Sequence, residues 1–495
     1  MRGLVTAALL FLLPHLVHAQ ARPDSSAVDR IVNDAMKAWH VPGVAVAIVQ
    51  NDRVVYVKGY GVRESGATLP VTPDTLFPIA STTKAFTTTA MAMLIDEKNM
   101  QWDDPVRKHL EYFHMADPCA DSMVTLRDIV SHRTGFSRHD ELWDGTTWSS
   151  EDVLRHAGDL KLSAPFRTTY QYQNIMFIAA GRAVAAASKM SWADFVRTRI
   201  FEPLGMTHTR IGLADYNASE HASGHSFDPK TGTIKTIPVA EDVNIEGAGA
   251  IKSSARDLGQ WLRLQLSDGT FDGKRLVSAE ALAETHTPQT VIRVEGATKE
   301  TNPETSLEAY GLGWVIQDYR GELLVSHAGA LHSSRTQVDL LPKIHSGFVV
   351  LSNLNRSLAV TSMRNSLADL LLGRPSPRDW NAYYLALDKK SDAKDAQTKL
   401  EREAKRKRDT KPSRELSAYA GTYESNAYGT AIIAASDLGL TLRWGRLAIP
   451  LRHFHFDTFD AVDEGSDIDE QTTFRLDANG EVKTMTLFGE EFVKK

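Results

Sequence analysis

Strand-like sequence lies at both ends of a long and mainly helical stretch, and this arrangement limits the fold more than any other feature of the chain. Residues 43–49 and 53–57 are rich in Val and Ala and are joined by the turn residues Asn51 and Asp52, which is typical of a β-hairpin. Further strand-like segments lie between residues 311 and 352. We therefore predict one sheet made from both ends of a block of roughly 340 residues, with helices inserted between its strands and a cleft between sheet and helices.

Flanking segments complete the predicted organisation. Residues 27–40 have the apolar spacing of an amphipathic helix, and residues 357–372 are expected to form a closing helix on the sheet. Residues 388–414 are dominated by charged side chains, which predicts a solvated helix or linker. Residues 416–495 alternate apolar and polar side chains and contain the hairpin signal Asn479-Gly480, so we expect a separate all-β unit there.

Composition and charge exclude some classes of function. The chain has 495 residues, of which 42% are hydrophobic, and this supports ordinary globular cores. Its formal net charge of −6 and its pI near 6.3 provide no basic field for nucleic acid. We therefore expect a small-molecule or peptide substrate as the partner, and no nucleic acid.

The first residues have the pattern of an export signal. Arg2 precedes a mostly apolar run over residues 4–17, and Val17-His18-Ala19 fits the small-residue cleavage rule. The run is shorter than the ~20 residues that a bilayer requires, and we expect no integral membrane segment in the mature chain. Removal of residues 1–19 by cleavage after Ala19 would give a secreted or periplasmic protein.

Metal and disulfide chemistry find little support in the sequence. Cys119 is the only cysteine, which excludes an intrachain disulfide and a cysteine-based metal cluster. His453 and His455 would share one face of a strand, but no third ligand is evident. We expect neither a metal nor a cofactor.

The strongest chemical signal is Ser81-Thr82-Thr83-Lys84. It follows a turn and precedes apolar residues with helical spacing, so we expect Ser81 to open a buried helix. Residues three apart share one face of a helix, and the Lys84 amine can therefore contact the Ser81 hydroxyl and, when neutral, accept its proton. A helix N-cap is the alternative role for Ser81. A second Ser-x-x-Lys, at residues 391–394, lies in charged sequence without apolar periodicity and is interpreted as coincidence.

Two more motifs can complete such a site. Tyr172-Gln173-Asn174 lies in a loop before an apolar helix, where the phenol can share a proton with a lysine and the Asn amide can bind a substrate amide. His327-Ala328-Gly329 lies at the end of a predicted edge strand that can supply a backbone N–H to an oxyanion. Taken singly, Tyr172 and Asn174 could be a loop tyrosine and a capping residue, and His327 a strand-end residue.

Together the three motifs resemble those of the serine β-lactamase and penicillin-binding-protein superfamily, in the same order along the chain. The likeness is greatest to the β-lactamase-related, class C-like serine hydrolases, and it covers roughly residues 27–372. Supporting stretches at residues 126–135, 201–206 and 249–258 are similar as well. The resemblance implies an α+β fold, in which an antiparallel sheet is flanked by helices next to a helical region. Residues 416–495 resemble the small β-barrel that follows it in many exported relatives.

The resemblance also implies a role for each motif residue. Ser81 is the acyl-accepting nucleophile, Lys84 is its base, and Tyr172 relays protons to the leaving group and activates the deacylating water. Asn174 orients the substrate amide. The backbone N–H groups of Ser81 and Ala330 form the oxyanion hole.

His327 departs from the superfamily pattern, because β-lactamases and many transpeptidases carry a lysine at this place. A lysine is a permanent cation for a substrate carboxylate, whereas a histidine is largely neutral near pH 7. His327 and Gly329 are both expected to border the bound substrate, since a small residue lets the substrate approach the strand.

We expect an exported serine hydrolase that forms an acyl-enzyme on a peptide, amide or ester. A D-amino-acid peptidase or carboxypeptidase, or an esterase, is favoured over a β-lactamase because of His327. A non-catalytic sensing or binding protein of the same fold is the alternative from another class. The sequence contains no Gly-x-Ser-x-Gly and no His-Glu-x-x-His, which argues against an α/β-hydrolase and against a zinc protease.

Overall fold

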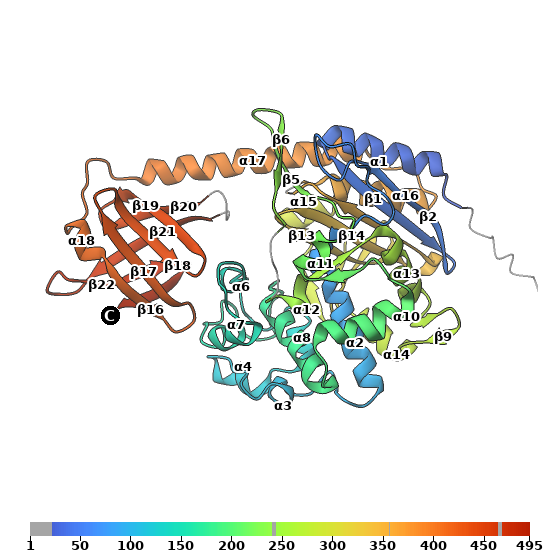
Figure 1. The fold of residues 1–495 in the computed structure, drawn as a ribbon, viewed down its shortest axis with the longest axis horizontal. Coiled ribbons are helices and arrows are strands. Elements are labelled where there is room, and N and C mark those ends of the chain that lie inside the picture. Colours follow the sequence, from blue (N-terminus) through green and yellow to red (C-terminus); the bar gives the residue numbers. More distant parts are fainter. Residues whose placement is uncertain (1–21, 240–243, 356, 464–467) are drawn as a thin grey trace, which may run out of the picture.

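A layered N-terminal domain and a C-terminal barrel are joined by one long helix (Figure 1). The computed structural model describes residues 22–239, 244–355, 357–463 and 468–495. The predicted export signal, residues 1–19, lies outside the described residues. Among those residues, no helix is both long enough and apolar enough to cross a bilayer.

The central sheet takes its strands from both ends of the N-terminal domain, as predicted. The strand order is β10-β11-β12-β13-β14-β15-β1-β2, and each neighbouring pair is antiparallel. Strand β1 joins the two ends, because Ala47 pairs with Val349 of β15 on one side and with Val57 of β2 on the other. The strands are β1 (Gly43–Gln50), β2 (Arg53–Gly61), β10 (Thr290–Ile292), β11 (Glu308–Tyr310), β12 (Val315–Tyr319), β13 (Glu322–Leu331), β14 (Ser334–Leu341) and β15 (Ser346–Ser352).

The prediction for the C-terminal strand run was wrong at its start. The sheet begins earlier, at β10 and β11, and residues 311–314 form a turn instead of a strand. Gly313 has φ +78°, and the Gly311 N–H donates to the Trp314 carbonyl at 2.7 Å, so this segment reverses the chain between β11 and β12. The apolar residues that suggested a strand are buried by this turn.

The alternation of side chains along β1 explains why both of its faces are apolar. Successive side chains of a strand point to opposite faces. Val44, Val46 and Ile48 pack with helices α1 (Ser25–Trp39) and α16 (Ala359–Leu371), while Ala45 and Ala47 belong to the core that contains α2 and α13. All of β1 is buried as a result.

Helix α2 (Thr83–Asp96) passes through the centre of the domain. Its side chains are buried on all sides from Thr83 to Leu94, which agrees with its nearly continuous apolar and Thr-rich sequence. The other helices of this region are α3 (Val106–His109), α4 (Pro118–Met123), α5 (Leu126–Ile129), α6 (Glu141–Asp144), α7 (Ser150–Ala157), α8 (Ile175–Ser188), α9 (Trp192–Val196), α10 (Glu202–Leu204), α11 (Leu213–Asn217), α12 (Glu246–Gly249), α13 (Ala255–Leu266), α14 (Ala279–Thr285) and α15 (Gly296–Thr301). Short paired strands lie among them: β3 (Phe77–Pro78), β4 (Arg210–Ile211), β5 (Gly224–Asp228), β6 (Thr233–Ile237), β7 (Ile251–Ser253), β8 (Thr270–Phe271) and β9 (Lys274–Arg275).

The charged segment between the two domains is largely helical. Helix α17 (Trp380–Lys405) buries Trp380 and Tyr384 near its start, and the rest of the helix is mainly exposed. Beyond α18 (Leu416–Tyr419), the chain forms a closed barrel in which each strand pairs with the next and β16 pairs with β23. Its strands are β16 (Gly421–Ser425), β17 (Gly429–Ser436), β18 (Gly439–Trp444), β19 (Leu447–His455), β20 (Thr458–Asp463), β21 (Ile468–Leu476), β22 (Val482–Leu487) and β23 (Glu490–Lys494).

Candidate active site

Ser81 lies in a short 3-10 turn between the central sheet and α2. The turn spans Ala80–Thr82 and α2 begins at Thr83, so Ser81 precedes the helix and does not open it as predicted. Neither N-cap position of these two segments makes a side-chain capping bond. The Ser81 hydroxyl instead receives a hydrogen bond from Lys84 Nζ at 3.0 Å.

The turn that carries Ser81 has an unusual backbone conformation at Ala80. Its φ is +50°, a left-handed value that costs a residue with a Cβ about 1–2 kcal/mol. Contacts with β14 hold the preceding residues in place: Thr336 Oγ1 donates to the Ile79 carbonyl at 3.0 Å, and Ser334 Oγ donates to the Pro78 carbonyl at 2.9 Å. The sheet therefore determines where Ser81 points.

Lys84 is fully buried and is surrounded by oxygen atoms. Its Nζ contacts Ser81 Oγ at 3.0 Å, Asn174 Oδ1 at 2.7 Å and the Ala248 carbonyl at 3.0 Å. Burial is the main cause that lowers the pKa of Lys84 well below its ordinary value; Asp140 opposes this shift and Arg138 adds to it. In the neutral amine, two N–H groups can serve Asn174 and Ala248 while the lone pair accepts the Ser81 proton. The site therefore suits Lys84 as a general base.

Tyr172 lies beside the same two groups. Lys84 Nζ is 5.0 Å from the centre of its ring. Burial raises the pKa of Tyr172, and the Ser81 hydroxyl and the Arg138 cation oppose the shift only in part. The resting phenol therefore keeps its proton at neutral pH, which fits a donor to a leaving group better than a resting base.

Asn174 connects Lys84 to an ion pair that sequence reasoning missed. Asn174 occupies the N-cap position of α8 without a side-chain capping bond. Its Nδ2 donates to Asp140 Oδ1 at 2.9 Å while its Oδ1 accepts from Lys84. Asp140 in turn pairs with Arg138 at 2.6 Å, and the Arg138 guanidinium lies 5.2 Å from the Tyr172 ring centre. Both partners of the pair therefore contact predicted site residues.

His327 is held as a neutral imidazole. Its Nδ1 lies 2.7 Å from the Ala328 carbonyl, which can only accept, so Nδ1 carries the proton. Its Nε2 lies 2.9 Å from the Tyr310 hydroxyl, which then donates to it. Burial, together with the nearby Lys84 amine, lowers the pKa of His327 to about 3. Both ring nitrogens are occupied within the protein, and neither offers a proton to a substrate carboxylate.

The strand that carries His327 was predicted as an edge strand, but it lies inside the sheet. Only its second half lacks a paired strand on the β12 side, among the residues that the structure describes. Strand β13 pairs with β14 as far as Leu331, but its pairing with β12 ends at Ser326. Gly329 packs against the segment before Ser81, where an added Cβ would lie 2.2 Å from the Ile79 carbonyl. Ala330 is exposed one residue further along β13. The predicted oxyanion donors, the N–H groups of Ser81 and Ala330, therefore belong to two adjacent segments.

Comparison with known proteins decides the family. A family model described as Beta-lactamase matches residues 28–373. The chain belongs to the Beta-lactamase family. A second model, described as a domain of unknown function (DUF3471), matches residues 405–494, which contain the barrel.

Two curated relatives of this Beta-lactamase family member come from Aspergillus. Unguisins hydrolase ungD' of Aspergillus campestris (strain IBT 28561) is 32% identical over 376 residues, which are 72% of this chain and 68% of the relative. Unguisins hydrolase ungD of Aspergillus violaceofuscus (strain CBS 115571) is 30% identical over 433 residues, which are 81% of this chain and 75% of the relative.

Solved structures agree with the fold of the Beta-lactamase family. The octameric penicillin-binding protein homologue from Pyrococcus abyssi has a TM-score of 0.63 at 23% identity and covers 95% of this chain and 100% of its own. D-amino acid amidase from Ochrobactrum anthropi SV3 has a TM-score of 0.57 at 20% identity, covering 70% of this chain and 97% of its own. The β-lactamase-like fold followed by a barrel is therefore confirmed. With this family membership, the chain is a serine hydrolase.

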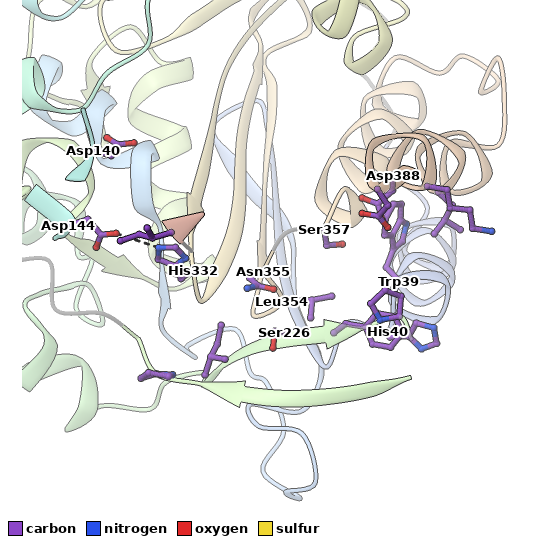
Figure 2. A pocket seen from close by; sticks show the side chains of 18 of the residues that line it. Trp39, His40, Asp140, Asp144, Ser226, His332, Leu354, Asn355, Ser357 and Asp388 are labelled. Carbon is purple, nitrogen blue, oxygen red and sulfur yellow. Dashed lines mark ion pairs between the residues drawn. The ribbon is translucent and has the colours of Figure 1, made fainter. Parts of the chain in front are cut away.

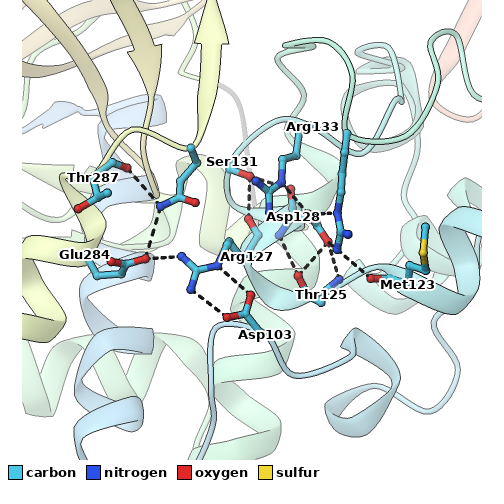
Figure 3. A network of polar contacts seen from close by, with 11 residues as sticks. Asp103, Met123, Thr125, Arg127, Asp128, Ser131, Arg133, Glu284 and Thr287 are labelled. Atoms are coloured by element: carbon cyan, nitrogen blue, oxygen red, sulfur yellow. Dashed lines mark hydrogen bonds and ion pairs between the residues drawn. The ribbon is translucent and has the colours of Figure 1, made fainter.

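One of the supporting stretches of the Beta-lactamase family member, residues 126–135, has a structural role centred on Asp128 (Figure 3). Asp128 is fully buried and accepts from Arg133 Nε at 2.6 Å and from Arg167 Nη2 at 2.7 Å. It also closes a capping box with Thr125 at the start of α5. Burial alone would raise the pKa of Asp128, but these bonds, led by Arg167, hold it below its ordinary value.

The same stretch places His132 next to Tyr172, the residue predicted to relay protons. The His132 ring lies 4.3 Å from the Tyr172 ring and 4.4 Å from the Tyr310 ring, measured between centroids. Its Nδ1 accepts from the Gln173 N–H at 3.4 Å. His132 therefore joins the Tyr172 loop to the tyrosine that holds His327.

Asp140, the partner of Asn174 and Arg138, also lines a cavity of about 1030 Å³. Figure 2 shows Asp140 and Asp144 on one side, near His332, with Trp39 and Asp388 on the other. Leu447 and Ile468 of the barrel also line it. The cavity is as large as the small-molecule sites of other proteins, but Ser81, Lys84, Tyr172 and His327 are not among its lining residues.

Nothing in the geometry of the described residues requires a metal: none of their His, Cys, Asp and Glu side chains form a group of three able to hold one. His453 Nε2 instead bonds the Phe456 carbonyl at 2.9 Å.

Proposed function

We propose that this chain hydrolyses amide or ester bonds through an acyl-enzyme on Ser81. The observation that carries the proposal is the fully buried Lys84 amine, 3.0 Å from Ser81 Oγ, whose burial lowers its pKa. A neutral amine at this distance activates a serine hydroxyl without a histidine.

The first half of the reaction forms the acyl-enzyme. Ser81 Oγ attacks the substrate carbonyl carbon while its proton passes to Lys84 Nζ, and the Ser81 and Ala330 N–H groups stabilise the oxyanion. The carbonyl then re-forms, the bond to the leaving group breaks, and the leaving amine or alcohol takes the Tyr172 proton. The proton held by Lys84 passes back to Tyr172.

The second half releases the acid. Water attacks the Ser81 ester while Tyr172 accepts one of its protons and passes its own proton to Lys84 Nζ. Collapse of the second intermediate breaks the bond to Ser81 Oγ, which takes the proton back from Lys84, and the carboxylic acid leaves. The net reaction is hydrolysis, with no other reactant consumed.

The neutral subsite at His327 supports substrates without a carboxylate next to the reacting bond. We therefore favour D-amino-acid peptide or amide hydrolysis, or ester hydrolysis, over D-carboxypeptidase and β-lactamase activity. The names of the relatives support this order, since two are hydrolases of unguisins and one structural neighbour is a D-amino acid amidase. We also propose export through residues 1–19, a proposal that rests on the sequence pattern alone.

The test is turnover of three chromogenic substrates by the wild type and by Ser81→Ala. The panel holds an activated acetyl ester, a D-alanyl anilide and a cephalosporin. We expect turnover of the ester or the anilide that falls by about 10⁴-fold in Ser81→Ala. Turnover unaffected by the substitution would contradict the proposal. A folded wild type without turnover or Ser81 acylation would favour the binding-protein alternative.

A further inference from the structure

The C-terminal barrel contacts the loop that carries Arg138 and Asp140. The Tyr428 hydroxyl lies 2.9 Å from His139 Nδ1, and His139 stands between those two residues in the chain. The same hydroxyl lies 3.5 Å from Glu141 Oε2. One barrel tyrosine therefore contacts the loop on both sides of Asp140.

Tyr428 is rigidly placed by the barrel itself. Its side chain is fully buried, and its carbonyl accepts a hydrogen bond from Trp444 Nε1 at 2.7 Å. Its ring packs against Trp444, with centroids 5.7 Å apart, and against Phe488 at 5.6 Å. The hydroxyl is thus presented from a packed core, which leaves it little freedom to move.

A second contact holds the far end of the same loop. The Arg446 N–H donates to the Gly145 carbonyl at 2.8 Å. The two segments of the chain lie close together there. A Cβ added to Gly145 would lie 2.5 Å from the Trp444 ring, and a Cβ added to Gly445 would lie 2.1 Å from the Gly145 carbonyl. The barrel therefore contacts the loop on both sides of α6, at His139 and at Gly145.

Residues of this loop are connected to Lys84 by hydrogen bonds. Asp140 accepts from Asn174 at 2.9 Å, and Asn174 accepts from Lys84 at 2.7 Å. Arg138 pairs with Asp140 at 2.6 Å and lies over the Tyr172 ring. A shift of the loop would move the partners of Lys84 and Tyr172 together.

We propose that the barrel is a positioning domain for the active site, in which Tyr428 holds His139 and thereby sets Asp140 against Asn174 and Arg138 against Tyr172. The inference rests on the proposed function of Ser81 and Lys84. It assigns to the barrel a role in turnover that needs no ligand of its own. Tyr428 is a positioning residue, since it acts through Asp140 and does not contact the reacting groups.

The test compares two barrel tyrosines in the full chain. Tyr428→Phe removes the hydroxyl that contacts the loop and keeps the ring. Tyr423→Phe is the matched control, because Tyr423 is also fully buried and its hydroxyl bonds the Tyr419 carbonyl at 2.7 Å, within the C-terminal unit. We expect kcat to fall about 10- to 100-fold in Tyr428→Phe, as for a small displacement of a catalytic group, and to stay near wild type in Tyr423→Phe. An equal effect of both substitutions would overturn the proposal.

A pH profile distinguishes positioning from simple loss of stability. Asp140 raises the pKa of Lys84, so a displaced Asp140 moves the rise of kcat/KM with pH to lower pH. The groups facing Lys84 that enter this profile are Asp140, Arg138, Tyr172, His132 and His327. We expect the rise to move in Tyr428→Phe, while Tyr423→Phe keeps the wild-type profile. An unchanged profile in Tyr428→Phe would count against the proposal.

A double substitution tests the route through Asp140. If Tyr428 acts through Asp140, Tyr428→Phe has little further effect on kcat in an Asp140→Asn background. A full additional loss there would show a different route and overturn the proposal.

Hydrogen exchange makes the test independent of turnover. Residues 138–149 should exchange faster in Tyr428→Phe than in Tyr423→Phe or the wild type. Should Tyr428→Phe fold poorly, His139→Ala removes the same contact from the other domain and must give the same result. Unchanged exchange in these variants would overturn the positioning role, whatever the substrate of the enzyme is. Turnover that does not depend on Ser81 would instead contradict the proposed function.

Discussion

Tyr310 donates its hydroxyl proton to His327 Nε2 at 2.9 Å. The His327 Nδ1–H group donates to the Ala328 carbonyl, and Nε2 accepts from Tyr310. The histidine therefore has no N–H group left to donate to a ligand. The His327 imidazole is therefore neutral near pH 7, and so is the substrate subsite that we propose beside it.

This neutrality predicts a preference between matched substrates. The wild type should turn over a D-alanyl peptide amide or methyl ester faster than the same peptide with a free carboxylate in place of the amide or ester group. His327→Lys should improve the relative kcat/KM for the carboxylate by about 10-fold, the effect of one modest ionic contact. His345→Lys adds the same charge at an exposed position and serves as the control. A wild-type preference for the free carboxylate would contradict the prediction.

Replacement of the Lys84 amine should abolish turnover and stabilise the protein at pH 7. Lys84→Met removes a fully buried group whose pKa is lowered by burial, so we expect at least a 10³-fold loss of kcat and a higher free energy of unfolding at pH 7.

The sign of the pH dependence follows from the protons bound. Between the folded pKa of Lys84 and the ordinary value near 10.5, the unfolded state binds a proton that the folded state does not, so wild-type stability rises with pH. The advantage of Lys84→Met should shrink as pH approaches 10. Denaturant titrations at pH 7 and pH 10 measure this difference, and an advantage that grows with pH would contradict it.

The buried carboxylate beneath the Tyr172 loop is expected to be essential for stability. Asp128→Ala leaves Arg133 and Arg167 without their shared partner and should cost about 3–5 kcal/mol. Asp103→Ala, in the same region, removes a carboxylate that is 70% exposed and should cost less than about 1 kcal/mol. Thermal unfolding of both variants checks the contrast.

Acid should remove the contribution of Asp128. Its pKa is held below the ordinary value in the folded state, so the stability it confers is complete above the unfolded pKa near 3.8 and is lost as pH falls through the folded pKa. The difference between wild type and Asp128→Asn should therefore be smaller at pH 2 than at pH 6. A constant difference would mean that Asp128 acts only through its packing.

Gly329 is expected to tolerate no side chain. A Cβ would lie 2.2 Å from the Ile79 carbonyl, so Gly329→Ala must move either β13 or the turn that carries Ser81. We expect about a 100-fold loss of kcat with the fold retained. Ala328→Ser, at the exposed neighbouring position, should keep most of the activity. Steady-state kinetics and circular dichroism of the two variants provide the test.

The parts of the site that could be predicted are those with local spacing or a motif. Ser81 and Lys84 meet because they are three positions apart along a helical path, and the structure shows this contact at 3.0 Å. Asp140 carried no such signal, since its partner Asn174 is 34 residues away and nothing in the intervening sequence implies the contact. The turn at residues 311–314 was predicted as a strand because its apolar residues pack in the core, and burial alone does not distinguish a strand from a buried turn.

The sequence by itself determined the sheet built from both chain ends, the all-β unit at the C-terminus and the contact between Ser81 and Lys84, since periodicity and short spacing are properties of neighbouring residues. Only the tertiary structure decided the chemical state of these groups. Burial lowers the pKa of both Lys84 and His327, and Tyr428 contacts His139 in the Asp140 loop across 289 residues of sequence. Such effects depend on which groups exclude water from one another, and that is settled when distant segments pack together.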